Sequence, residues 1–106
     1  MPYFYGLELS YNEFSKFPFE PLDCYGLTVF GIRGQRDKNG ERCLSEWPTG
    51  IYQHVGLRGF YIGSNNLGMI NDTISPLCYY LEISDNPDIV FDASGVCYEY
   101  SIGAYY

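Results

Sequence analysis

Acidic and aromatic side chains gather at the C-terminal end of the sequence, and their types indicate recognition chemistry. Carboxylates steer and orient a basic partner, whereas tyrosines bury a flat apolar ring and keep the hydroxyl hydrated. Residues 77–106 contain no Lys, Arg or His. These groups therefore predict a docking surface for a basic protein. Its candidate residues are Tyr79, Glu82, Asp85, Asp88, Asp92, Tyr98, Glu99 and Tyr100.

Catalysis by the same side chains would require a second group at a defined distance. His54 is the only histidine, and a lone imidazole acts as a base only beside a nucleophile and an orienting carboxylate. Glu82 and Glu99 could act as an acid–base pair on a sugar, but the sequence does not set their separation. We predict no catalysis. The alternative is a small-ligand or hydrolytic domain, with a tyrosine-lined pocket for a carbohydrate or a nucleotide.

Motifs for cofactors and metals are absent from the sequence. The 12 glycines are scattered and form no phosphate-binding loop. The four cysteines, Cys24, Cys43, Cys78 and Cys97, form no C-x-x-C pair, so the spacing of a zinc site is missing. We expect no metal and no cofactor. Because the number of cysteines is even, all of them could form disulfide bonds. In a reducing compartment they would instead be buried free thiols.

The charge is uneven along the chain. The formal net charge is -7, and residues 59–106 carry six acids and no base. Such a surface repels nucleic-acid phosphates and acidic membranes, and it attracts basic proteins. We therefore predict a non-catalytic acidic module that binds a basic protein surface, with no direct nucleic acid and no membrane partner. A stoichiometric inhibitor of a nucleic-acid-handling protein fits this description, such as a phage anti-defence or toxin-immunity protein.

Length and segment composition suggest one domain, 1–106, in the cytoplasm. With 106 residues the chain can bury a core without a metal or disulfide. The first residues lack the basic and apolar regions of a signal peptide. A second copy of the chain is another partner compatible with this composition, as a homodimer.

The spacing of apolar and turn residues predicts short strands over residues 3–9, 24–33, 41–47, 51–62, 77–83, 89–92 and 96–106. Asn39 and Gly40 predict a tight hairpin turn, and Ser10 with Glu13 forms a capping box for a helix over 11–17. Alternation of apolar and polar residues favours antiparallel pairing. The expected fold is mainly β, an antiparallel sandwich or small barrel of about seven strands with one short helix near the N-terminus.

The cysteines suggest an internal duplication. Cys24 and Cys43 are 19 residues apart, as are Cys78 and Cys97. A shift of 54 residues superposes the two pairs. The chain would then consist of two related halves, 1–52 and 53–106.

Overall fold

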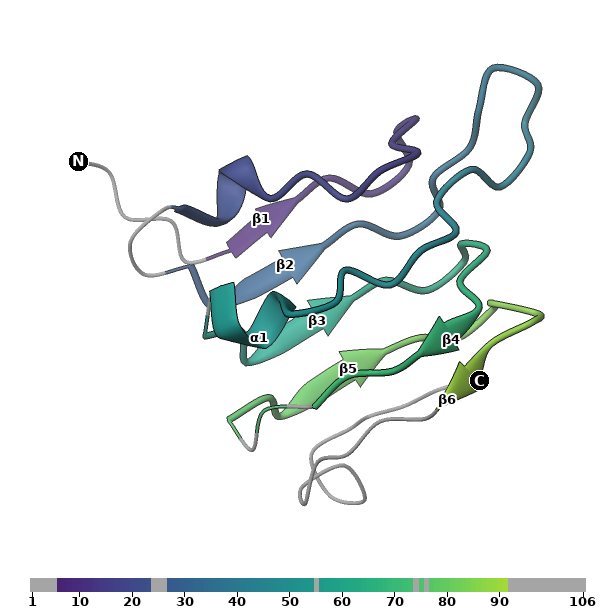
Figure 1. Cartoon of the computed structure of the whole chain (residues 1–106). Helices are drawn as coiled ribbons and strands as arrows, with labels where there is room; N and C mark the ends of the chain where they lie inside the picture. Colours follow the sequence, from purple (N-terminus) through teal and green to yellow (C-terminus); the bar gives the residue numbers. More distant parts are fainter. Residues whose placement is uncertain (1–5, 24–26, 55, 74, 76, 92–106) are drawn as a thin grey trace.

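A four-stranded parallel sheet organises the chain (Figure 1). The structure is a computed structural model, and it describes residues 6–23, 27–54, 56–73, 75 and 77–91. Successive strands are neighbours in the sheet, and every adjacent pair is parallel. Each connection must therefore leave the sheet, cross one face and return to the same end. The strands, in sheet order, are β1 (Gly6–Glu8), β2 (Val29–Gly31), β3 (Gly59–Tyr61) and β5 (Tyr80–Glu82).

The connections form a second layer over one face of the sheet. They contain a 3-10 helix (Glu20–Asp23), the four-residue helix α1 (Ile51–His54), and the strands β4 (Met69–Ile70) and β6 (Val90–Phe91). β4 and β6 pair in parallel as a small second sheet. In Figure 1 α1 and β4 cross in front of β3 and β5. Among the described residues no helix is both long and apolar enough to span a bilayer.

The core lies between these two layers and is built from a repeated apolar spacing. Each turn of the chain presents apolar side chains three residues before the strand centre, at the centre and two residues after it. Neighbouring strands align these positions into columns, because the register pairs Phe30 with Phe60 and Phe60 with Leu81. Burying each such side chain stabilises the fold by about 1.5–3 kcal/mol relative to exposure. The fully buried members are Phe30, Phe60, Leu81, Ile32, Ile62, Ile83, Leu57 and Cys78.

Buried amide side chains join consecutive turns beyond the strands. Gln35 and Asn65 are fully buried, and Asn86 is 5% exposed. Asn65 Nδ2 donates to the carbonyl of Ile62 in its own turn and to that of Ile32 in the preceding turn, both at 3.0 Å. Gln35 and Asn86 make the corresponding bonds to the preceding turn, at 3.0 and 3.4 Å. These amides satisfy backbone groups that the ladder of short strands leaves unpaired.

A left-handed residue precedes each of these three amides and also Asn12, which has the equivalent place in the first turn. The φ angles are 63° at Tyr11, 62° at Gly34, 57° at Ser64 and 56° at Asp85. Three of these four residues are not glycine, and non-glycine residues rarely adopt positive φ, so their occurrence at the same place in consecutive turns marks a common backbone bend. The bend turns the chain out of the sheet and towards the second layer.

The predicted antiparallel sandwich or barrel, and with it the description of the chain as all-β, is wrong. All four strands of the main sheet are parallel, and short helices lie in the connections. The prediction failed because the second layer covers only one face of this parallel sheet. Parallel sheets are usually covered on both faces and have continuous apolar strands, whereas the alternation here imitates a half-buried antiparallel strand. The described strands are also only two or three residues long.

Four local predictions have different outcomes. The turn at Asn39 and Gly40 is present: Gly40 has φ 79° and donates to the carbonyl of Asp37 at 2.9 Å. Only the antiparallel bridge between Arg36 and Arg42 accompanies it, so the long hairpin arms are absent. The predicted helix over 11–17 does not form, and the described α-helix is at Ile51–His54. The predicted strand over 96–106 lies outside the described residues.

The described cysteines differ in environment. Cys43 is a half-buried free thiol whose Sγ lies 3.3 Å from the carbonyl oxygen of Phe14. Cys78 is buried in the core and accepts a hydrogen bond from the Tyr52 hydroxyl at 3.2 Å. Cys24 and Cys97 lie outside the described residues, and the division into halves 1–52 and 53–106 stays a prediction.

Candidate functional site

The candidate site is the face of the main sheet that the second layer does not cover. Side chains on this face alternate with the core residues along each strand. Three rows cross the sheet from one edge to the other. The rows are Gly6, Val29, Gly59 and Tyr80; Glu8, Gly31, Tyr61 and Glu82; and Ser10, Arg33, Gly63 and Ser84.

One end of this face is apolar and aromatic. The rings of Tyr61 and Tyr80, on adjacent strands, lie 5.1 Å apart at an interplanar angle of 38°. Gly59 lies between them and Val29, since a Cβ placed there would be 3.6 Å from side-chain atoms of both Tyr61 and Val29. All three side chains are half-buried. The result is an apolar patch with tyrosine hydroxyls, a composition enriched at protein interfaces.

An ion pair lies beside these tyrosines, because the register places Glu82 directly opposite Tyr61. Glu82, 6% exposed, accepts a hydrogen bond from the backbone N–H of Gly63 at 2.9 Å and another from the Ser84 hydroxyl. Arg33 Nε lies 3.2 Å from Glu82 Oε1, although the buried N–H does not point at the oxygen. The contact is therefore Coulombic and holds the guanidinium in place. The Arg33 side chain is 39% exposed, so it is accessible from solvent.

Two glycines make room for the carboxylates on this face. A Cβ at Gly63 would lie 2.2 Å from Glu82 Oε2, and a Cβ at Gly31 would lie 2.6 Å from Glu8 Oε1. Glu8 also accepts hydrogen bonds from the backbone N–H of Ser10, at 2.9 Å, and from its hydroxyl. Both carboxylates thus lie flat against neighbouring glycines rather than projecting freely.

A second ion pair flanks the face where the chain leaves β5. Asp85 Oδ1 lies 2.8 Å from Arg42 Nη2, and its Oδ2 accepts a hydrogen bond from the Ser64 hydroxyl at 3.0 Å. The hydrogen bond from Arg42, and then that from Ser64, hold the pKa of Asp85 below its usual value. Asp85 is exposed, so the pair is open to solvent. The predicted acidic surface is thus partly neutralised by arginines.

The remaining predicted partner-binding residues are scattered. Tyr79 is 61% exposed, and its ring centroid lies 5.9 Å from Arg58 Cζ. Asp88 is exposed in the turn before β6. Thus Tyr79, Glu82 and Asp85 lie on or beside the open face. The other four, Asp92, Tyr98, Glu99 and Tyr100, lie outside the described residues.

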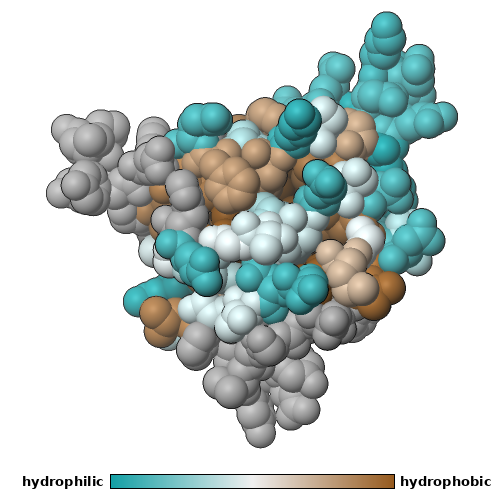
Figure 2. Space-filling model, viewed as in Figure 1, coloured by the Kyte–Doolittle hydropathy of each residue, from teal (hydrophilic) through white to brown (hydrophobic). Residues whose placement is uncertain are grey.

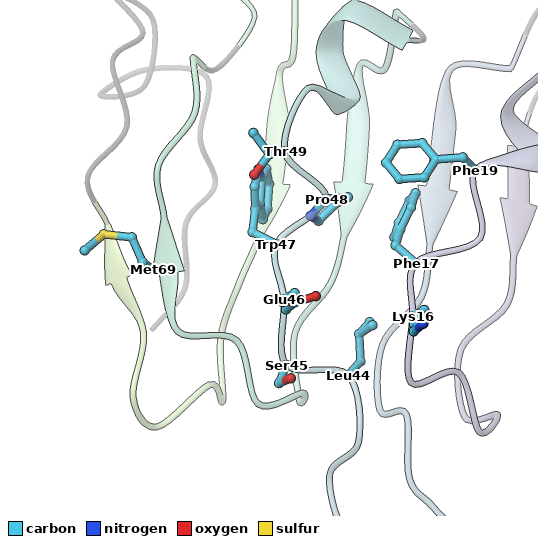
Figure 3. Close-up of a pocket in the computed structure, with 10 residues that line it drawn as sticks. All are labelled: Lys16, Phe17, Phe19, Leu44, Ser45, Glu46, Trp47, Pro48, Thr49 and Met69. Carbon is cyan, nitrogen blue, oxygen red and sulfur yellow. The ribbon is translucent and has the colours of Figure 1, made fainter.

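A pocket opens on the other layer (Figure 3). It has a volume of about 600 Å³, and Phe17 and Phe19 lie on one side of segment 44–49 while Met69 lies on the other. Trp47 in its wall donates from Nε1 to Asp72 at 2.9 Å, so its polar group is engaged. The ten lining residues include no tyrosine and a single acid, Glu46. This pocket does not match the tyrosine-lined ligand site considered from the sequence.

A grouping of metal ligands is not found in the described parts of the chain. No three of the described His, Cys, Asp and Glu residues are grouped to hold a metal ion. His54 is the last residue of α1. Figure 2 shows the layer of connections, where hydrophobic and hydrophilic residues are mixed and the hydrophilic 37–41 turn projects from the body. The open face of the sheet remains the better candidate.

The sequence contains a pattern that would have revealed this face. Apolar residues at positions 1, 4 and 6 and an amide at position 9 occur in 27–35 and 57–65, and in 78–86 with Cys78 at the first position. The strand starts Gly6, Val29, Gly59 and Tyr80 are separated by 23, 30 and 21 residues. The unequal spacing concealed the repeat. Its alignment identifies Glu8, Val29, Arg33, Tyr61 and Tyr80 as surface residues that the sequence prediction missed.

Comparison with protein-family models finds no match, and comparison with curated proteins finds none either. The chain is similar to a solved leucine-rich repeat protein from Bacteroides eggerthii, with 46% identity and a TM-score of 0.85 over 98% of this chain and 18% of that one. It is also similar to a leucine-rich repeat protein from Bacteroides thetaiotaomicron, with 37% identity and a TM-score of 0.79 over 90% of this chain and 14% of that one. The chain therefore spans less than a fifth of either structure's length. The sheet is a parallel sheet of the leucine-rich-repeat type.

Proposed function

We propose that this parallel sheet of the leucine-rich-repeat type acts as a non-catalytic protein-binding module and that the partner docks on the open face of the sheet. The observation that carries the proposal is the arrangement on that face. An apolar tyrosine pair, Tyr61 and Tyr80, lies beside the ion pair of Arg33 and Glu82, because the register places Glu82 directly opposite Tyr61. Aromatic anchors beside oriented charges are typical of interface hot spots.

The fixed positions of the side chains on the open face also support protein binding. The side chains of the face stand on strands whose registers are fixed by the ladder and by the buried amides. A surface that is ordered before binding loses little conformational entropy when a partner docks. Leucine-rich-repeat folds are typically non-catalytic.

We propose a basic surface as the partner, because the net charge of the chain is -7. The acids would steer a basic partner, and the arginines held by Glu82 and Asp85 would orient it. An inhibitor of a nucleic-acid-handling protein is the narrower form of this proposal, and net charge alone supports it.

A comparison of binding by matched variants tests the proposal. The immobilised chain would be exposed to lysate of the source organism at low salt, and retained proteins would be quantified by mass spectrometry. Tyr61→Ala and Arg33→Ala alter the open face, whereas Phe19→Ala and Glu46→Ala alter the pocket on the other layer. Far-UV circular dichroism checks that each variant folds.

The expected result is a set of proteins retained by the native chain and by the pocket variants and lost by the two face variants. Removing an aromatic or arginine anchor costs about 2 kcal/mol or more, roughly 30-fold in affinity. Retention that depends instead on Phe19 and Glu46 would assign binding to the pocket layer and refute the proposal.

A further inference from the structure

The charged side chains of the open face differ in what they leave free for a partner. Both oxygens of the Glu82 carboxylate are engaged: Oε1 accepts a hydrogen bond from the backbone N–H of Gly63 at 2.9 Å, and Oε2 accepts one from the Ser84 hydroxyl. Glu82 is also buried. A donor from a docked protein would therefore meet a carboxylate that is already bonded and largely covered.

Arg33 is in the opposite situation. Its Nε is buried 3.2 Å from Glu82 Oε1 and makes no hydrogen bond, whereas the side chain as a whole is 39% exposed. The exposed surface therefore belongs to the rest of the side chain, which includes the two terminal nitrogens. A guanidinium has five N–H donors and no acceptor, so only an acceptor can satisfy it.

The backbone of Arg33 is fixed on both sides. Its N–H donates to the Ser10 hydroxyl at 2.9 Å, and its carbonyl accepts from the N–H of Tyr11 at 2.8 Å. Gly63 has no side chain, so Arg33 reaches across β3 to Glu82 on the next strand. The guanidinium thus has a set position before a partner arrives, which reduces the entropy lost on binding.

The aromatic pair lies next to this guanidinium. The register places Tyr61 opposite Gly31, and Arg33 follows Gly31 by two residues on the same face. Tyr80 lies beside Tyr61, with the ring centroids 5.1 Å apart. An apolar group on the tyrosines and an acceptor on the guanidinium would therefore come from neighbouring side chains of one partner.

Glu8 is the remaining charged residue in the three rows of the face. Its Oε1 accepts hydrogen bonds from the N–H and the hydroxyl of Ser10, yet the residue is exposed. It is thus accessible to a cation of the partner. The face offers both signs of charge, with Glu8 for a basic group and Arg33 for an acceptor.

We propose that Arg33 pairs with a side-chain carboxylate of the docked protein, and that an apolar or aromatic side chain of the same protein covers Tyr61 and Tyr80. This inference rests on the proposed docking of a protein on the open face. A carboxylate matches a guanidinium in charge and in geometry, because two parallel N–H···O bonds can form. The net charge of -7 attracts a basic surface, and Arg33 sets the place of one acid within that surface.

The net charge and the local contact make opposite demands on a bound peptide. Attraction by the net charge favours Lys and Arg throughout the peptide. Arg33 favours Asp or Glu at one position near an aromatic or apolar residue. Because the two effects have opposite signs, an acid that is enriched against the net charge reports the contact with Arg33.

Selection from a phage-displayed library of random peptides tests the inference. The peptides are fused to the coat protein by their C-termini, so an enriched acid is a side chain and not a chain end. The immobilised chains are the native one, Arg33→Glu, Arg33→Gln, Tyr61→Ala and Lys38→Glu. Lys38 is exposed on the projecting 37–41 turn, so Lys38→Glu makes the same change in net charge as Arg33→Glu and is the control.

We expect the native chain and Lys38→Glu to enrich Asp or Glu close to an aromatic or large apolar residue. Arg33→Glu should enrich Lys or Arg at that place, and Arg33→Gln should enrich neither sign. In a selected peptide made synthetically, exchange of the acid for its amide should weaken binding to the native chain roughly 5- to 30-fold. The same exchange should weaken binding to Arg33→Gln less than about 2-fold.

Equal enrichment of an acid by Arg33→Glu and by the native chain would overturn the inference, as would enrichment of Lys or Arg at that place by the native chain. Loss of the same peptides on Tyr61→Ala would then leave docking on the open face intact. Peptides that bind independently of both Tyr61 and Arg33, or selection of none, would count against both proposals. If Arg33→Glu does not fold because it faces Glu82, the comparison of Arg33→Gln with the native chain decides the question.

Discussion

The side-chain oxygen of Asn65 accepts a hydrogen bond from the backbone N–H of Gln35 at 2.8 Å. The nitrogen of the same amide donates to carbonyls of both turns, so one side chain joins two consecutive turns. The stability of a sheet with strands of two or three residues depends on such bonds, because each strand alone supplies few ladder contacts.

Asn65→Ala should therefore be among the most destabilising substitutions in the chain. It leaves the N–H of Gln35 and the carbonyl of Ile32 unsatisfied in a dry interior, and it removes a fully buried side chain. We expect a loss of about 2–4 kcal/mol in the free energy of unfolding, measured by urea denaturation. Asn12→Ala, at the equivalent exposed position, should cost about 1 kcal/mol or less. Equal losses would show that the bonds between turns contribute little.

Gly63→Ala should disrupt the open face. The new Cβ would lie 2.2 Å from Glu82 Oε2, and that carboxylate is held by the Gly63 N–H, the Ser84 hydroxyl and Arg33. We expect a loss of about 1–3 kcal/mol. Gly56 is exposed and has no atom within 4 Å of an added Cβ, so Gly56→Ala should be neutral or stabilise by up to about 1 kcal/mol. Thermal unfolding of both variants measures the difference, and a neutral Gly63→Ala would contradict the tight fit.

The pair of Asp85 and Arg42 should contribute stability only where Asp85 is ionised. Because the pKa of Asp85 is lower in the folded chain than in the unfolded one, its contribution is complete above the unfolded value, about 3.9, and is lost as pH falls through the folded value. The native chain should exceed Asp85→Asn in stability at neutral pH, and the two should converge at strongly acidic pH. Asp88→Asn makes the same change in net charge at an exposed position that forms no ion pair with a described residue, and it is the control for net charge. A constant difference between the native chain and Asp85→Asn would contradict the assignment.

Cys43 should react slowly with alkylating agents. Burial, and then the nearby carboxylates of Asp37 and Glu13, raise the pKa of this thiol, so less thiolate is present at neutral pH. Iodoacetamide labelling followed by peptide mass spectrometry should show a lower rate than glutathione has under the same conditions. Asp37→Asn removes one of the negative charges and should increase the rate modestly. A Cys43 rate equal to that of glutathione would be inconsistent with this environment.

The sequence contains the local pattern of this fold but not the direction of its strands. Phe30 and Ile32 alternate with polar or small residues just as Phe60 and Ile62 do, and alternation of this kind is shared by antiparallel and open parallel sheets. The repeat of the amide position distinguishes the open parallel sheet from an antiparallel one. The repeat is hard to recognise in the sequence. Gln35 stands where other turns have asparagine, Cys78 stands where other turns have leucine, and the intervals between turns are 23, 30 and 21 residues.

The candidate site was predictable only in part for the same reason. Tyr79, Glu82 and Asp85 are conspicuous in the acidic half of the sequence, and they lie on or beside the open face. Arg33 is distant in sequence and is brought to Glu82 by the strand order alone. Pairing of a carboxylate with a distant arginine is a property of topology, and composition gives no indication of it.

The left-handed bend has a consequence for how the turns of this chain are recognised. Tyr11, Gly34, Ser64 and Asp85 share a φ of 56–63° and share no side-chain chemistry. Alignment by residue type cannot match them, whereas alignment by backbone torsion matches them at once. The bend therefore marks the same position in each turn. A search of torsion angles would find related turns whose residues have diverged at every side-chain position.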